Sequence, residues 1–129
     1  MNTRYKNYFP LPNAIFSLGL LPGEIAVYSY LLYCEDRKTY QCYPSYRTIG
    51  NAVGMSQNTV QKYVSGLLEK GLINTENTCI VTKTGLKRNG SLLYTIRPIQ
   101  EAVDLYHQRQ LQKLEQDTAK IRISRKLPV

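Results

Sequence analysis

The spacing of apolar residues along the chain changes at Gly71. Before this glycine, apolar residues recur every three or four positions, which is the period of an amphipathic helix. After it, short runs rich in β-branched and aromatic residues indicate strands. The helical spacing returns after Pro98. The pattern therefore predicts a mainly α fold with a small β-hairpin.

The first long helix is expected to begin at Leu20–Glu24 and to fade near residue 35. Pro22 suits the first turn, and Glu24 places a carboxylate near the positive end of the helix. A shorter helical turn is expected after Pro12, because proline is favoured where a helix begins.

Residues 44–73 have the layout of a helix-turn-helix. Ser45 and Ser56 are each expected to cap a helix, because a hydroxyl can accept a hydrogen bond from an unpaired N–H of the first turn. Gly54 suits the left-handed conformation that ends the first helix. Helical spacing predicts that the second helix packs on the first through Val60, Val64 and Leu67.

The strand-like runs predict a hairpin from about Cys79 to Arg97. Its loop, residues 85–90, is bounded by glycines and carries Lys87 and Arg88. A hairpin that follows a helix-turn-helix is a wing, whose tip can reach a phosphate or enter the minor groove. The simpler alternative is a solvated turn.

The last helix is expected from Ile99 to Ala119. Its apolar stripe slips at Gln110, so the helix is not a clean heptad repeat. It can pack on the first helix or pair with a second copy of the chain. The sequence therefore predicts a winged helix-turn-helix at 1–97, a C-terminal helix at 98–119, and a mobile basic tail at 120–129 that can add phosphate contacts.

Charge is distributed unevenly along the chain. The 17 lysines and arginines exceed the 9 acidic residues, which gives a formal net charge of +8. Nine of these bases and only two of the acids lie in residues 37–97, so the excess coincides with the helix-turn-helix. This distribution is expected of a phosphate-binding face. A basic chain could also bind acidic lipid, but no segment has the strongly amphipathic, lysine-lined helix that this requires.

Few residues indicate catalysis, metal binding or cofactor binding. The three cysteines form no C-x-x-C pair, so neither a disulfide framework nor a zinc site is indicated. His107 is the only histidine, and the sequence has no P-loop and no dinucleotide-binding glycine motif. We therefore expect no enzymatic activity, no cofactor and no metal. The N-terminal region has no long apolar run, so we expect a cytoplasmic protein that does not enter a membrane.

Three ordered runs stand in the helix-turn-helix: Pro44-Ser45-x-Arg47-x-Ile49-Gly50, Gly54-Met55-Ser56-x-x-Thr59-Val60 and Leu67-x-x-x-Gly71-Leu72-Ile73. In this order they resemble the winged helix of GntR-type bacterial regulators. Gly50 replaces the customary alanine, and Thr48 stands where a capping-box acid would be. The wider layout, from Tyr8 to Arg97, is similar to the winged-helix domain of plasmid and mobile-element replication initiators and of small phage-like regulators. Both resemblances imply a winged helix that binds double-stranded DNA.

The polar face of the second helix is the candidate surface for recognising DNA bases. Amides can pair with adenine edges in the major groove, and lysine can pair with guanine or phosphate. We assign base contacts to Gln57, Asn58, Gln61 and Lys62, and backbone contacts to Arg47, Thr59, Lys87 and Arg88. The candidate DNA-binding residues are Arg47, Ser56, Gln57, Asn58, Thr59, Gln61, Lys62, Ser65, Lys87 and Arg88.

We interpret the chain as a small bacterial transcription regulator that binds specific double-stranded DNA with the helix at about 57–69. One alternative is a replication initiator, which would use the same face on repeated origin sites. Another is a winged helix that binds protein or RNA. A GntR-type regulator carries a large effector-binding domain after the wing, whereas about thirty residues follow it here. We therefore expect no small-molecule effector, and a homodimer formed through the last helix.

Overall fold

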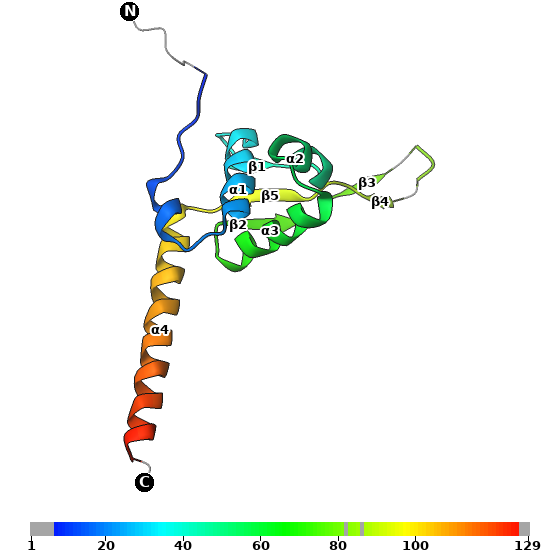
Figure 1. The fold of residues 1–129 in the computed structure, drawn as a ribbon. Coiled ribbons are helices and arrows are strands. Elements are labelled where there is room, and N and C mark those ends of the chain that lie inside the picture. The colour runs from blue at the N-terminus through cyan, green and yellow to red at the C-terminus, as the bar shows by residue number, and fades with distance from the viewer. Residues whose placement is uncertain (1–6, 82, 86, 127–129) are drawn as a thin grey trace, which may run out of the picture.

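The computed structural model describes residues 7–81, 83–85 and 87–126 (Figure 1). For residues 79–81, 87–89 and 124–126 it describes the main chain. The helices are η1, a 3-10 helix (Asn13–Ser17), α1 (Pro22–Cys34), α2 (Tyr46–Val53), α3 (Gln57–Glu69) and α4 (Ile99–Lys126). The strands are β1 (Gln41–Cys42), β2 (Ile73–Glu76), β3 (Cys79–Val81), β4 (Lys87–Asn89) and β5 (Leu93–Ile96). The predicted fold class, a winged helix-turn-helix with a C-terminal helix, is confirmed.

The helix caps form where the sequence predicts them. Ser45 accepts a hydrogen bond from the N–H of Thr48 at 3.1 Å, and Ser56 accepts one from the N–H of Thr59 at 3.2 Å. Gly54 ends α2 in the left-handed region, with φ of 74°. These interactions lie within a few residues of each other along the chain, so the local sequence alone defines the bounds of α2 and α3.

The core lies between the helices and a three-stranded antiparallel sheet of order β1-β5-β2. The register pairs Gln41 with Thr95 and Ile73 with Ile96. Alternate residues of β5 are buried, as expected for a strand with one face on the core. The largest fully buried core side chains include those of Tyr28, Tyr94, Ile15, Leu31, Ile49 and Leu67.

The wing is paired differently from the predicted hairpin. β3 pairs with β4 and not with β5, while β5 pairs with β2. The β2–β5 ladder belongs to the three-stranded sheet on the core, whereas the β3–β4 ladder forms a separate two-stranded ribbon that projects from the domain (Figure 1). Lys87 and Arg88 therefore lie in β4, where the prediction placed them in a loop. Leu86, also part of the predicted loop, lies outside the described residues.

A mismatch in residue number explains this error. Between the two ladders, residues 77–78 of one chain segment face residues 90–92 of the other, which is the one-residue excess of a β-bulge. The N–H of Gly90 donates to the Thr78 carbonyl at 2.7 Å, and the Thr78 hydroxyl donates to the Ser91 carbonyl. The strand β4 was not recognised because it has no β-branched or aromatic residue and pairs through its main chain.

The C-terminal helix is longer than predicted. It begins at Ile99 as expected, but it continues to Lys126, so the predicted helix end at Ala119 is wrong and residues 120–126 are helical. Residues 127–129 lie outside the described part of the chain. No glycine or proline interrupts the sequence before Pro128, and basic residues near a helix C-terminus interact favourably with the helix dipole.

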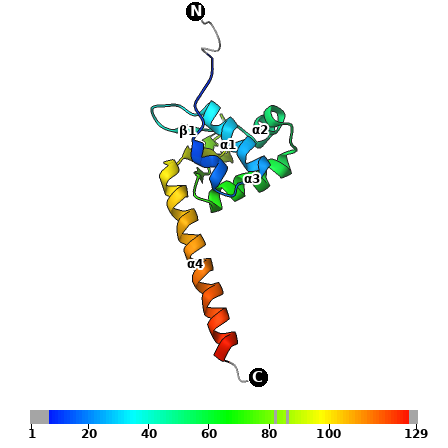
Figure 2. The same ribbon diagram turned by 60° about the vertical axis from the view of Figure 1, so that its left-hand side comes forward.

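Only the first turns of α4 pack on the domain. Ala102 is buried, and Ile99, Val103 and Tyr106 lie against the core. All side chains from His107 to Ile123 are exposed, and the helix projects away from the rest of the chain (Figure 2). The first part of the predicted dimer segment therefore belongs to the core of the single chain.

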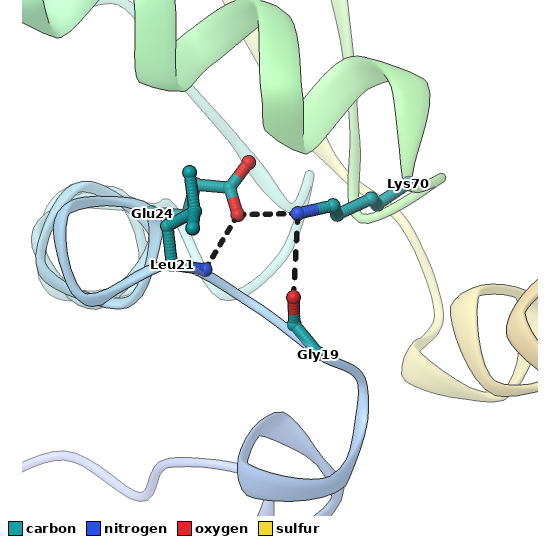
Figure 3. A network of polar contacts seen from close by, with 4 residues as sticks. All are labelled: Gly19, Leu21, Glu24 and Lys70. Carbon is teal, nitrogen blue, oxygen red and sulfur yellow. Dashed lines mark hydrogen bonds and ion pairs between the residues drawn. The ribbon is translucent and has the colours of Figure 1, made fainter.

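A buried ion pair joins α1 to the end of α3 (Figure 3). The Glu24 side chain is 2 % exposed, and its Oε1 lies 2.6 Å from the Lys70 Nζ. The same oxygen accepts from the N–H of Leu21 at 2.7 Å, and Lys70 also reaches the carbonyl of Gly19 at 3.4 Å. Sequence reasoning placed Glu24 near the helix dipole but gave no sign of a partner so far along the chain.

We predict that Lys70→Met lowers the free energy of unfolding by about 2–3 kcal/mol, because it leaves a buried carboxylate unpaired. Glu24→Gln should cost about 1 kcal/mol, since an amide oxygen can still accept from Leu21. Urea denaturation of both variants and of the double variant measures the coupling. If the two single effects simply add, the ion pair does not stabilise the fold.

Candidate nucleic-acid interface

The two faces of α3 differ sharply in chemistry. Val60, Val64 and Leu67 are buried in the core, which fixes the rotation of the helix about its axis. The polar candidates predicted from the sequence lie on its solvent side. The exposed ones are Gln57, Asn58, Gln61, Lys62 and Ser65. The structure thus brings these five side chains onto one exposed surface of a single helix.

The hydroxyl candidates are engaged in local structure. Ser56 accepts from the main chain of Thr59, and the two hydroxyls lie 2.9 Å apart. The Ser65 hydroxyl donates to the Gln61 carbonyl at 3.0 Å. The amides of Gln57, Asn58 and Gln61, in contrast, make no hydrogen bond to another described group. The amides are therefore the groups best prepared to pair with an external ligand.

Lys62 lies beside the contact between α3 and α1. Its Nζ is 5.6 Å from the centre of the Tyr63 ring, a weak cation–π contact at an exposed site. The Tyr63 ring packs on Gly23, where a Cβ would overlap it. Because Tyr63 is anchored and the Lys62 side chain is exposed, the ammonium group can exchange this contact for a phosphate or a guanine edge.

The remaining candidates lie on other elements of the same unit. Arg47 is exposed in the first turn of α2, and α2 packs directly on α3. Lys87 and Arg88 lie in β4 of the wing, where the main chain alone is described. The wing and α4 leave the domain in different directions (Figure 1).

Sequence reasoning missed two residues of the exposed α3 surface, Leu68 and Glu69. Glu69 is exposed and lies seven residues after Lys62 and four after Ser65, so it shares their side of the helix. A carboxylate there repels phosphate and limits close approach of the C-terminal turn. The part of this surface that is free of acidic residues therefore ends before Glu69. Extending the helical period to residue 69 could have identified this limit.

Gly50 sets the approach of α2 to the turn before α3. A Cβ on this buried residue would overlap the main-chain oxygen of Met55, and the N–H of Met55 donates to the Gly50 carbonyl at 2.9 Å. Alanine, customary at this position in GntR-type sequences, would have to push the turn away. The position of α3 in this chain thus depends on a glycine.

The described ranges hold no group of three or more His, Cys, Asp or Glu side chains placed to bind a metal ion. Burial raises the pKa of the Cys42 thiol to about 12, with smaller effects from Cys34 and Glu35, so Cys42 stays protonated at neutral pH. Among the described helices, none combines the length and apolar character needed to cross a membrane.

The arrangement of α1 to α3 and the wing defines a winged helix-turn-helix. Residues 18–73, from the turn before α1 to the start of β2, match the model of a family described as a helix-turn-helix domain. A solved structure described as a possible transcriptional regulator from Methanosarcina mazei Go1 is similar over 81 % of this chain and 82 % of its own, with a TM-score of 0.52 and 18 % identity. That likeness shows a shared fold. No match was found among curated proteins.

We predict that Gly50→Ala lowers the free energy of unfolding by roughly 1–3 kcal/mol, because its methyl group meets a main-chain oxygen. Ala52→Gly, on the exposed side of the same helix, is the control, and should cost about 1 kcal/mol through helix propensity alone. Thermal unfolding followed by circular dichroism compares the two. A Gly50→Ala variant as stable as the wild type would show that the turn relaxes freely.

Proposed function

We propose that the chain is a non-catalytic transcription regulator that binds specific sites on double-stranded DNA. In this proposal α3 enters the major groove and the wing contacts the backbone or the minor groove. The observation that carries the proposal is the face of unpaired amides and one lysine on the second helix of a helix-turn-helix domain. The similar M. mazei structure is described as a possible transcriptional regulator, which supports the same role.

Charge supports the proposal independently of shape. The region from residue 37 to residue 97 holds nine basic and two acidic residues, and it contains α2, α3 and the wing. Such an excess attracts the phosphate backbone whatever the base sequence, whereas the amides of α3 can distinguish base edges. Affinity and specificity would thus come from different residues of one domain.

The regulator is proposed to act as a homodimer joined by α4. Leu111, Leu114 and Ile121 are 60 %, 62 % and 52 % exposed in the single chain, which leaves apolar surface for a partner. A two-fold dimer would match two half-sites of a palindromic operator.

We predict that Gln61→Ala or Asn58→Ala costs about 1–3 kcal/mol of binding to the preferred DNA site and leaves random DNA nearly unaffected. The preferred site is first obtained by selection from random duplexes. Gln112→Ala on α4 is the matched control and should bind like the wild type. If the α3 variants lose affinity equally on selected and scrambled duplexes, α3 does not read bases. If the wild type has no duplex affinity at low salt, the proposed function is wrong.

Replacing Lys87 and Arg88 together with alanine should weaken binding to all duplexes alike. The slope of log affinity against log salt should also become shallower by about one unit for each phosphate that the wing no longer neutralises. A double replacement of Lys113 and Lys120 on α4 removes the same charge from another element. A salt titration in which both double variants change the slope equally would indicate attraction by net charge, without direct binding of the wing to phosphate.

A further inference from the structure

The exposed part of α4 has a regularly spaced stripe in which three of five residues are apolar. It consists of His107, Leu111, Leu114, Thr118 and Ile121, hereafter the distal stripe. The steps between these residues alternate between four and three positions, which is the a/d spacing of a coiled coil. The Thr118 hydroxyl donates to the Leu114 carbonyl at 2.8 Å, so its polar group is satisfied within the helix and its methyl group can join the stripe.

The distal stripe begins where α4 leaves the domain. The residues of α4 that lie against the core are Ile99, Ala102, Val103 and Tyr106. Leu111 lies two and a half helical turns after Ala102 and is on the opposite side of the helix, whereas Ile121 lies five turns after Val103 and is on the same side as that residue. The slip at Gln110 thus lies one turn past the last packing residue. Because α4 projects away from the domain, the side chains of the distal stripe are exposed whichever side they face (Figure 2).

The geometry points to a second copy of this chain as the occupant of the distal stripe, paired in parallel and in register. In that arrangement Leu111, Leu114, Thr118 and Ile121 each meet the same residue of the second copy. Asp117 then occupies a g position, and Arg122 an e position five residues later. Asp117 of each chain faces Arg122 of the other, so two symmetric ion pairs flank the apolar seam.

The antiparallel alternative has the opposite electrostatics. The register that places Leu111 opposite Ile121 of the second copy also brings e positions against e positions and g against g. Glu115 then faces Glu115, and Asp117 faces Asp117. Like charges at these flanking positions oppose association, so the charge pattern selects the parallel pair.

The relative direction of the two α4 helices determines whether both helix-turn-helix units can reach one DNA duplex. In this respect the inference rests on the proposed function. The 28 residues of α4 span about 40 Å at the rise of an α-helix. A parallel pair places both helix-turn-helix units at the same end, where they can reach neighbouring half-sites of one duplex. An antiparallel pair would separate the units by about the length of the helix.

Charge reversal in the full chain tests the parallel pair. Asp117→Arg and Arg122→Asp should each raise the dimer dissociation constant about tenfold, because each puts like charges at both flanks of the seam. An equimolar mixture of the two variants, and the double variant that carries both changes, should recover wild-type dimerisation. Lys113→Asp, which makes the same charge change as Arg122→Asp on the outer side of α4, should have little effect. Sedimentation equilibrium measures all five, and circular dichroism confirms the helix content.

Three results would overturn the inference: a wild type that stays monomeric into the high-micromolar range, charge reversals that leave dimerisation unchanged, or a mixture that does not recover it. These outcomes are separable from the proposed function. A monomer that still binds selected duplex DNA would remove the parallel pair and keep the function. A dimer with the expected charge dependence but no affinity for duplex DNA would keep the parallel pair and remove the proposed function.

Discussion

The close contact between α1 and α3 is the constraint on which the rest of the structure depends. Gly23 and Gly66 lie at this contact, and a Cβ on either would overlap a side chain of the facing helix, Tyr63 or Glu24. The space allows the Glu24 carboxylate to be buried between the helices and neutralised by Lys70 at the end of α3. A buried charge tolerates little displacement, because moving its partner away exposes the full cost of desolvation. The pair therefore fixes how α3 lies on α1.

This constraint gives α3 its two distinct faces. Its valines and Leu67 are held in the core, so the opposite side presents amides and Lys62 in a fixed orientation. At the other end of α3 the Ser56 cap fixes where the helix begins, and the close contact of Gly50 with Met55 holds the end of α2 against the turn before it. On a rigid helix the main chain is already ordered, so binding costs only the freedom of the side chains, which favours such a helix for recognition.

Structural features that depend on residues close together in the sequence were predicted, whereas contacts between residues far apart in the sequence were missed. Ser45, Gly54 and Ser56 act within four residues of their partners, so local sequence patterns were enough to predict the helix-turn-helix. The exposed candidates on α3 followed from helical period. The Glu24–Lys70 pair and the register of β2 on β5 join residues far apart in the chain, and no local pattern encodes them. Lys87 and Arg88 were placed in a loop because their side chains do not favour strands, whereas main-chain pairing decided their conformation.

Because the distal stripe is short, pairing of two α4 helices would be weak and would depend on binding of the two domains to DNA. An isolated helix of about this length is marginal in water, and a seam of three apolar layers and one threonine layer would hold two chains only weakly. Two domains held at one end would nevertheless present a second binding unit at high effective concentration once the first has bound DNA. By linkage, a duplex with two half-sites would strengthen the pairing of the helices as much as the pairing strengthens binding to the duplex. In the proposed parallel pair the ion pairs would fix the orientation and the DNA would supply the remaining affinity, so a weak seam with directional charges would suit a dimer that forms on its target.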